Sequence, residues 1–303
     1  MSEPQSETSP LDKDLCGIAN LRRFRHAAMA ATFDIFIVHK DALYAEQAAQ
    51  DAFNELDHIE NNLSRFIENS DVSRINSLGP NCPLQLGPAA FECLQKSIGM
   101  YQKTNGAFDV TFDSSHKGSN LLKLNESEHT VELLADGVRI DLGAIGKGYA
   151  ADKMGQILGD WGIDTALISA GQSTILPVGV PQGLKGWPLT LSDPTDYNRV
   201  LAKIHLKGLS LSASGLQKGP HIINPRSGKP AKGKLAAWAT TKTASTGRLT
   251  AAAADALSTA FMVMPIGEIR AFCKANPDTS AFLILPPAKK GSVSRVLQFG
   301  SWK

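Results

Sequence analysis

A glycine-rich segment with a single lysine has residue types that could bind an anion. It reads IDLGAIGKGYAADKM over residues 140–154 and carries Gly143, Gly146, Lys147 and Gly148. It follows an alternating apolar stretch and precedes a sequence typical of a helix. Glycines allow close backbone approach, and free N–H groups at a helix N-terminus favour a negative charge. We expect a phosphate or pyrophosphate beside Lys147; a tight strand-to-helix turn without a ligand is the alternative.

Two known phosphate-binding motifs can be tested against this segment. A P-loop needs Gly five residues before the Gly-Lys pair and Ser or Thr after it, but Asp141 and Gly148 stand there. A dinucleotide fingerprint fits Gly146, Gly148 and Ala151. However, no Asp or Glu between residues 169 and 191 could bind a ribose. The sequence therefore disfavours both a P-loop and a nicotinamide-binding Rossmann domain.

A carboxylate and a hydroxyl share one predicted helical face near the C-terminus. Asp255 and Thr259 are four residues apart in ADALSTA, within the alanine-rich segment 248–265. Their oxygens suit Mg²⁺, which takes one or two protein carboxylates and completes its shell with phosphate and water oxygens. An exposed Asp near the helix start, with Thr bonded to the preceding turn, is the alternative.

A histidine could act as a base in a third motif, HIINPRSGKP, over residues 221–230. His221 enters a short apolar strand that stops at an Asn-Pro and Ser-Gly turn. Its imidazole can accept a proton near neutral pH, as activation of a hydroxyl nucleophile requires. A structural or solvent-exposed histidine is the alternative, and the other six histidines lack metal-ligand spacing.

Hydrophobic periodicity predicts the elements that position these residues. Helices and strands mix without strict alternation, which predicts an α+β fold with mixed, largely antiparallel sheets and packed helices. A further helix follows the glycine segment, and residues 226–249 are the most loop-like interior region. The patterns predict strands over 31–38, 106–112 and 165–171, helices over 43–66 and 88–106, and a hairpin over 130–142 around Asp136-Gly137.

Composition restricts the class of ligand and the domain organisation. The 303 residues include 31 basic and 29 acidic side chains, which indicates neither a nucleic-acid partner nor a polybasic membrane surface. Four dispersed cysteines lack the spacing of a zinc or redox motif. Residues 1–21 resemble a disordered or loosely attached tail, followed by a single domain over 22–303. No secretory signal or transmembrane segment is evident, so we expect a cytoplasmic protein, or one cut from an exported precursor.

Taken in order, eight segments resemble the ApbE family of FAD:protein FMN transferases. They are MAATFDI, LSRFIENSDVSRIN, GAFDVTF, IDLGAIGKGYAAD, ISAG, SASG, HIINPRSGKP and ADALSTA. The resemblance covers nearly the whole chain after about residue 22 and implies an ApbE-like fold. It also implies Mg²⁺-dependent transfer of FMN from FAD to a Ser or Thr hydroxyl of an acceptor flavoprotein, with release of AMP.

The resemblance implies a role for each candidate residue. Asp255 and Thr259 match side-chain metal ligands, which a backbone carbonyl of the glycine segment would complete, and His221 matches the family histidine and is the candidate general base. The segment from Gly143 to Gly148 would lie against the pyrophosphate, with Lys147 as countercharge. The positions implied around the flavin nucleotide are Met29, Asp109, Gly143, Gly146, Lys147, Gly148, Asp152 and Gly171.

The chain departs from the family pattern at two main positions. Gln172 replaces the second glycine of Asn-x-Gly-Gly, and Asn224 replaces the aspartate of His-x-x-Asp-Pro. A side chain then stands where backbone would approach the nucleotide, and a charge near His221 is lost. Two alternatives to transfer therefore stay open, namely a Mg²⁺-dependent FAD pyrophosphatase that makes FMN and AMP, and a protein that binds FAD without chemistry.

Overall fold

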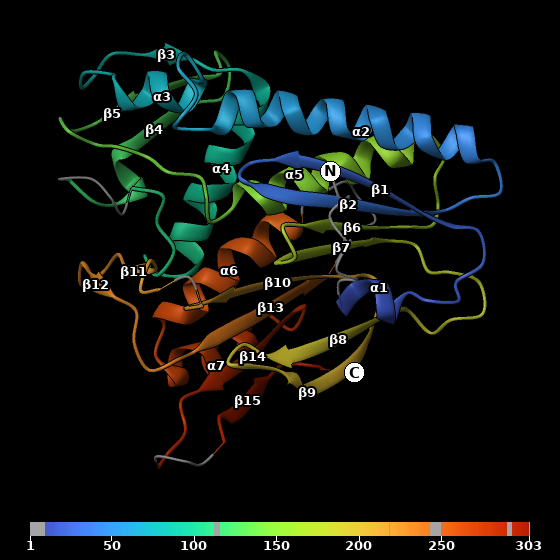
Figure 1. Ribbon diagram of the computed structural model, residues 1–303. Helices are drawn as coiled ribbons and strands as arrows, with labels where there is room; N and C mark the ends of the chain where they lie inside the picture. The colour runs from blue at the N-terminus through green and yellow to red at the C-terminus, as the bar shows by residue number, and fades with distance from the viewer. Residues whose placement is uncertain (1–9, 112–115, 218, 243–249, 290–292, 303) are drawn as a thin grey trace, which may run out of the picture.

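A computed structural model describes residues 10–302 apart from 112–115, 218, 243–249 and 290–292, and its centre is an eight-stranded sheet (Figure 1). Every strand pair in the described residues is antiparallel, so the α+β fold class is confirmed. In spatial order the strands are β1 (Leu21–Ala28), β2 (Ala31–Val38), β6 (Ala166–Ala170), β7 (Thr174–Val178), β10 (Leu209–Gly215), β13 (Ala236–Lys242), β14 (Thr279–Leu285) and β15 (Arg295–Phe299).

Both faces of this sheet are covered, because successive side chains of a strand point to opposite faces. In β2, Phe33, Ile35 and Ile37 join the core beneath the helices, whereas Phe36 joins a second core on the other face. Trp238 of β13 likewise enters the second core between two alanines of the first. The central strands are therefore apolar at consecutive positions.

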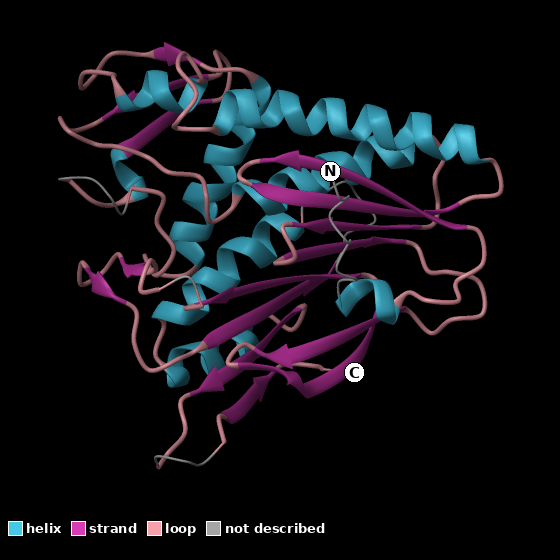
Figure 2. Cartoon of the chain, in the orientation of Figure 1, coloured by secondary structure: helices cyan, strands magenta, loops and turns pink. Residues whose placement is uncertain are grey.

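The helices lie along one side of the long strands (Figure 2). They are α2 (Ala42–Leu63), α4 (Pro88–Lys103), α5 (Gly146–Asp160), α6 (Ala251–Val263) and α7 (Ile266–Ala275). The helices predicted over 43–66 and 88–106, and after the glycine segment, are confirmed. Among the described helices, none combines the length and apolar composition needed to cross a bilayer.

The opposite face of the sheet carries α1 (Pro10–Asp14) and the hairpin of β8 (Trp187–Asp193) and β9 (Asp196–Leu206). The carboxylate of Asp14 accepts hydrogen bonds from the backbone N and the hydroxyl of Thr190, both at 2.7 Å, and Leu15 is buried. Of the expected loose tail, residues 1–9 lie outside the described residues. Farther along, Leu11, Leu15 and Ile18 pack against the second core, and Leu21 begins β1.

Smaller elements lie at one end of the molecule, on the left in Figure 1. They are α3 (Asp71–Asn76), η1 (Ser119–Leu121), a three-stranded sheet of β3 (Leu84–Gln85), β5 (Thr130–Leu133) and β4 (Leu122–Asn125), and the short pair β11 (Ile223–Asn224) and β12 (Lys229–Pro230).

The hairpin predicted over 130–142 is wrong. Its first half is β5, which pairs with β3 and β4 instead of with its own continuation. The second half crosses towards α5, and the side-chain amide of Asn76 takes the place of a strand partner. Asn76 accepts from the backbone N of Ile140 at 2.7 Å and donates to its carbonyl at 3.0 Å.

Two other local predictions are also wrong. Described residues 106–111 form turns, not a strand, because the carboxylate of Asp109 accepts the backbone N–H of Thr111 at 2.9 Å and removes it from a ladder. Within the supposed loop 226–249, residues 236–242 are β13, in the middle of the sheet. Lys, Gly and Ser on both sides obscured this buried strand; residues 243–249 lie outside the described residues.

Helices α5 and α6 touch backbone to backbone at Gly148. A Cβ at this position would lie 2.2 Å from the carbonyl oxygen of Ala251 and 2.7 Å from the Cα of Ala252. The backbone N of Gly148 donates to the carboxylate of Asp255 at 3.1 Å across the same contact. Glycine is therefore required here for the approach of the two helices.

We expect Gly148→Ala to lower the free energy of unfolding by at least about 1–3 kcal/mol, the usual cost of overpacking a core. Urea unfolding followed by circular dichroism measures this change. Gly159→Ala, in the same helix with no atom within 4 Å of the added Cβ, is the control. It should gain about 0.5–1 kcal/mol from helix propensity. Equal stability of the two variants would contradict the packing role of Gly148.

Candidate functional site

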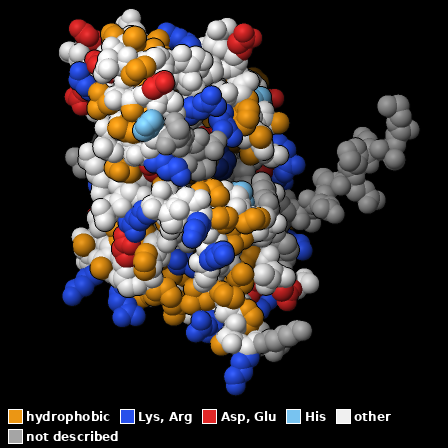
Figure 3. All heavy atoms as spheres, turned by 90° about the vertical axis from the view of Figure 1, so that its left-hand side faces the viewer, with side chains coloured by type: hydrophobic (Ala, Val, Ile, Leu, Met, Phe, Trp, Pro, Cys, Tyr) orange, Lys and Arg blue, Asp and Glu red, His pale blue; other side chains and the backbone are white. Residues whose placement is uncertain are grey.

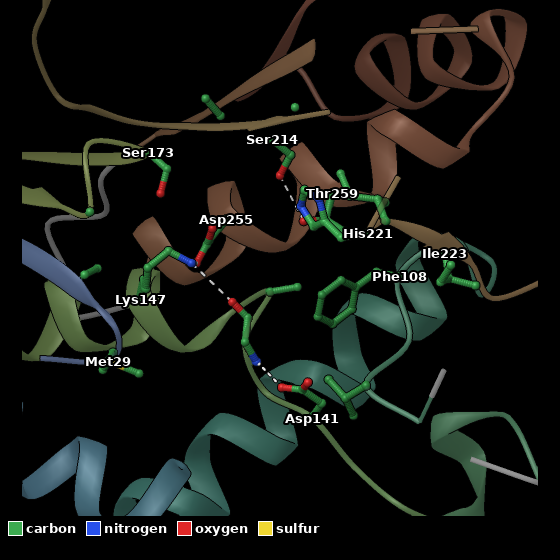
Figure 4. A pocket seen from close by; sticks show the side chains of 18 of the residues that line it. Met29, Phe108, Asp141, Lys147, Ser173, Ser214, His221, Ile223, Asp255 and Thr259 are labelled. Carbon is green, nitrogen blue, oxygen red and sulfur yellow. Dashed lines mark hydrogen bonds and ion pairs between the residues drawn. The ribbon is translucent and has the colours of Figure 1, made fainter. Parts of the chain in front are cut away.

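A cavity of about 680 Å³ opens among turns and helix ends that are far apart in the sequence (Figure 4). This volume is typical of cofactor and substrate sites. The walls come from the β1–β2 turn, the glycine segment, the β6–β7 turn, the end of β10, the segment before β11, and α6. Among the predicted site residues, those that line it are Met29, Asp109, Gly143, Lys147, Gly171, His221, Asp255 and Thr259.

The lysine of the glycine segment points into the cavity towards a carboxylate. Lys147 Nζ donates to the carbonyl of Gly143 at 3.2 Å and lies 3.9 Å from Oδ2 of Asp255 (Figure 4). The carboxylate of Asp141 fixes the loop from below, because it accepts the backbone N–H of Gly143 at 2.8 Å. The ammonium is thus held at a partly buried place where an anionic ligand would be attracted.

Asp255 and Thr259 present their oxygens from one face of α6, as the four-residue spacing predicted. Asp255 is only 3% exposed, so the alternative of an exposed carboxylate is wrong. Ser212 Oγ donates to Asp255 Oδ1 at 3.2 Å. The hydroxyl of Thr259 lies 3.0 Å from that of Ser214, at the end of β10. Strand β10 therefore orients both α6 side chains towards the cavity.

The oxygen atoms around Lys147 match the preferences of Mg²⁺. The described residues contain no cluster of three or more His, Cys, Asp or Glu side chains that could hold a metal. A cation here would instead use one carboxylate, the Thr259 hydroxyl and a backbone carbonyl such as that of Gly143. These are hard oxygen donors, and a single protein carboxylate is usual for Mg²⁺ that shares phosphate and water ligands.

His221 lines the cavity and is exposed to solvent. Its Nδ1 lies 2.9 Å from the carbonyl oxygen of Gly219. A carbonyl can only accept, so this bond places the proton on Nδ1 and leaves Nε2 with a free lone pair. His221 therefore has the tautomer that a general base needs.

Asn224, the departure beside His221, closes a turn. Its Oδ1 accepts the backbone N–H of Arg226 at 2.9 Å, and its carbonyl accepts that of Gly228 at 2.8 Å. A turn of this type needs an acceptor oxygen, which Asn supplies as well as Asp. The substitution thus preserves the local conformation of the His221 segment.

Two hairpin turns form the wall beside Lys147. Met29 and Ala30, both at φ of 52°, make the β1–β2 turn, and the backbone N of Met29 donates to Glu60 at 2.7 Å. Gly171 has a φ of +62°, and a Cβ there would lie 3.0 Å from Ala31 and 3.4 Å from the Lys147 side chain. Gly171 is needed for close approach at this wall, as expected for the family glycine.

Asp109 lines the cavity through a tightly bonded turn. Its Oδ1 accepts from the hydroxyls of Thr111 at 2.8 Å and Ser119 at 2.7 Å, besides the backbone N–H of Thr111. These bonds hold Asp109 and the neighbouring Phe108 in place at the cavity wall. All three bonds fall on Oδ1, and this oxygen thereby holds the turn that shapes the wall.

Three residues predicted around the nucleotide do not line the cavity, namely Gly146, Gly148 and Asp152. Gly146 packs beneath Met29, whose Cε would lie 3.1 Å from an added Cβ. Asp152 lies behind the wall, where its two oxygens accept the backbone N–H groups of Ala251 and Ala252, each at 2.9 Å. It therefore caps the N-terminus of α6. Burial raises the pKa of Asp152 to about 6, against the opposing hydrogen bonds.

Several cavity residues were not singled out from the sequence. Arg65 pairs with Asp141 at 3.2 Å, and Ser173 and Ser214 contribute hydroxyls to the wall. The Asp-x-Gly spacing of Asp141 and Gly143 was a local signal for the turn they form, but the other side chains converge only through tertiary structure. Gln172 is exposed, has a φ of +59° and does not line the cavity.

The face that includes β11 and β12 is rich in basic side chains. Figure 3 shows this face, at the left of Figure 1, with more Lys and Arg than Asp and Glu in view. Because the formal charge of the whole chain is only +2, this is a local bias. Such a face attracts anionic ligands.

The fold is that of solved flavin transferases. The solved structure of the flavin transferase ApbE from Vibrio cholerae superposes with a TM-score of 0.79 and 19% identity, covering 93% of this chain and 97% of that one. The ApbE protein of Thermotoga maritima gives a TM-score of 0.77 and 23% identity, over 91% and 96% of the two chains. At these identities the likeness establishes the fold.

Sequence comparison supplies the family. The ApbE family model matches residues 29–283. A curated FAD:protein FMN transferase of Buchnera aphidicola is 26% identical over 214 residues, which span 58% of this chain and 62% of the relative. One from Treponema pallidum is 25% identical over 85% of this chain and 83% of its own length. The chain belongs to the ApbE family and is a transferase enzyme.

The position of Asp152 predicts a pH-dependent stability. Its folded pKa of about 6 lies above the ordinary value of 3.8, so the folded state binds a proton between these limits that the unfolded state has lost. The contribution of Asp152 to stability therefore falls as pH rises from about 4 to 6. Relative to Asp152→Asn, which does not titrate, the native protein should lose up to about 3 kcal/mol across this window, at about 1.4 kcal/mol per pKa unit.

Urea unfolding of both proteins at several pH values between 4 and 7.5 measures this difference. Asp278→Asn, at an exposed carboxylate, is the control and should follow the native curve. Parallel curves for the native protein and Asp152→Asn would show that Asp152 ionises as an ordinary carboxyl group.

Proposed function

We propose that the protein transfers FMN from FAD to a Ser or Thr hydroxyl of an acceptor protein and releases AMP, with Mg²⁺ bound at Asp255 and Thr259. The observation that carries this proposal is the convergence of Lys147, the α6 oxygens and His221 on one cavity. The curated relatives named FAD:protein FMN transferase support the choice of substrate and reaction.

The cavity provides the positioning and charge neutralisation that phosphoryl-type transfer requires. Lys147 binds the pyrophosphate of FAD as a point charge, and Arg65 contributes a second cation at the wall. Asp255, Thr259 and a glycine-segment carbonyl would hold Mg²⁺, which would supply neutralisation of phosphate charge. Met29, Gly171 and Phe108 form less polar walls suited to the rings of a nucleotide.

His221 receives the proton of the acceptor hydroxyl on its free Nε2. The hydroxyl oxygen forms a bond to the phosphorus of the FMN half, and the bond from that phosphorus to the bridging oxygen breaks. AMP leaves with the bridging oxygen and its electron pair. The hydrogen bond from Nδ1 to Gly219 keeps the imidazole oriented and steadies the charge that develops on it.

Hydrolysis of FAD to FMN and AMP is a second candidate activity, favoured by the exposure of His221. Water can reach the same base when no acceptor occupies the cavity mouth. The residues needed are unchanged, so hydrolysis is expected as a slower side reaction. A protein that binds FAD without chemistry would release no AMP, with or without the acceptor protein.

The reaction is tested by the intact mass of an acceptor domain after incubation with the protein, FAD and Mg²⁺. We expect a mass gain equal to one FMN and an equimolar amount of AMP, both abolished by EDTA. AMP and free FMN without a mass gain would show that the protein hydrolyses FAD and does not transfer FMN. Bound FAD with no AMP would show that the protein binds FAD without catalysing its cleavage. A mass gain in EDTA would contradict the metal assignment.

Two substitutions test the roles of α6 and His221. Asp255→Ala should lower the rate of AMP release on the order of 10²-fold or more, since a bound cation supplies several kcal/mol of charge stabilisation. His221→Ala should lower it 10²–10⁴-fold, the typical contribution of a general base. Asp278→Ala and His205→Ala, outside the cavity, are the matched controls. Native rates in either cavity variant would remove that residue from the mechanism.

A further inference from the structure

Lys234 is the buried lysine of the described residues, at 6% exposure. It lies just before β13, and its ammonium donates to the carbonyl of Met264 at 2.6 Å and to that of Met262 at 3.3 Å. Both carbonyls belong to the C-terminal end of α6, whose other end carries Asp255. A residue outside the cavity therefore contacts the helix that supplies the proposed metal ligands.

The end of α6 needs such a partner. Its last carbonyls have no intrahelical donor, and Pro265 follows the C-cap residue Met264 without an N–H to offer. Met262 and Met264 are each 1% exposed, so water is not available to these residues. The ammonium of Lys234 satisfies two carbonyls and complements the negative end of the helix dipole.

A carboxylate on α7, the helix that follows α6, anchors the segment that carries His221. Glu268 accepts two hydrogen bonds from the guanidinium of Arg226, at 2.6 and 2.8 Å. Arg226 also donates to the carbonyls of Thr104 at 2.7 Å and Asn105 at 2.9 Å, at the end of α4. Arg226 thus fixes the turn that follows His221 onto α4 and α7.

The two halves of this arrangement adjoin along the chain, because Met264, whose carbonyl binds Lys234, is followed by Pro265 and by the first turn of α7, which carries Glu268. Burial lowers the pKa of Lys234 to about 8, and the nearby Glu268 carboxylate opposes that shift. Hydrogen bonds from Arg226 chiefly lower the pKa of Glu268, with a smaller contribution from Lys234. Glu268 therefore binds Arg226 directly, at the start of the helix that follows the Lys234-capped end of α6.

We propose that Lys234 and Glu268 are positioning residues that couple the C-terminal end of α6 to the His221 segment. Thr259 is less than one helical turn from Met262, so a displaced helix end moves the Thr259 hydroxyl directly. Misplacement of reacting groups by 1 Å can cost on the order of 10²-fold in rate. This inference rests on the proposed function, because the coupling would hold His221 and the α6 oxygen ligands at a fixed separation.

The test compares two variants of the full chain, in each of which methionine replaces one cationic side chain. Lys234→Met keeps the stem and removes the ammonium. Arg199→Met is the matched control, because Arg199 is a cation bound to the buried Asp193 on the β8–β9 hairpin, which contributes no cavity residue. The main readout is the imidazole resonance of His221 in a histidine-selective NMR spectrum, assigned with His221→Ala.

We expect Lys234→Met to shift the His221 resonance, while Arg199→Met lowers the melting temperature and leaves that resonance at its native position. An unchanged His221 resonance in Lys234→Met, with a lowered melting temperature, would reduce Lys234 to a stability role and overturn the proposal. If Lys234→Met does not fold, Lys234→Gln decides, because it removes the ammonium and shortens the reach to the α6 carbonyls; a native His221 resonance in that variant would overturn the proposal. Lys234→Arg should restore the native resonance.

A second readout is the affinity for Mn²⁺ alone, measured by calorimetry against Asp255→Ala. Lys234→Met should raise the dissociation constant on the order of tenfold, the lower end of the effect of residues that orient metal ligands. Arg199→Met should leave it unchanged, and an unchanged constant in Lys234→Met would argue against the α6 half of the coupling. The failure of the proposed function is distinguishable, because a native protein that binds no Mn²⁺ or transfers no FMN still gives the His221 resonance.

Discussion

The contact between α5 and α6 at Gly148 sets the distance between the two charged halves of the site. Lys147 precedes the contact on one helix, and Asp255 follows it by one turn on the other, so their 3.9 Å separation depends on a backbone approach that no Cβ permits. Asp152 fixes the same pair of helices from within the protein by binding the first N–H groups of α6. The glycine segment thus acts mainly by bringing two helices together, and within it Asp141, Gly143, Ala144 and Lys147 line the cavity.

The sheet supplies the opposite wall, and its registration follows from burial on both faces. A shift of one residue in β2 would move Phe33, Ile35 and Ile37 out of the core beneath the helices. With the register fixed, the β1–β2 and β6–β7 turns lie side by side, where the backbone N of Gly171 donates to the carbonyl of Thr32 at 3.0 Å. The left-handed conformations of these turns therefore follow from the sheet pairing, and the turns form part of the cavity wall.

Local signals in the sequence predicted the long helices, strands β2 and β6, and the shared face of Asp255 and Thr259, because periodicity and spacing record which side chains point the same way. They failed where side chains replaced backbone partners, as at Asn76 with Ile140 and Asp109 with Thr111. The family resemblance placed Asp152 around the nucleotide, whereas its carboxylate caps α6, a role that no local pattern distinguishes from facing a ligand. Lys234 lies in a polar segment, and its burial depends on the helix end that it meets.

The two departures from the family pattern have different physical consequences. At Asn224 the turn needs an acceptor oxygen and not a charge, so the amide preserves the conformation of the His221 segment. At Gln172 the backbone keeps a left-handed φ, which costs a non-glycine residue on the order of 1–2 kcal/mol, while its side chain is exposed outside the cavity. The folding free energy offsets that strain, and the Gln172 side chain does not line the cavity. Both changes thus leave the arrangement of Lys147, Asp255, Thr259 and His221 intact.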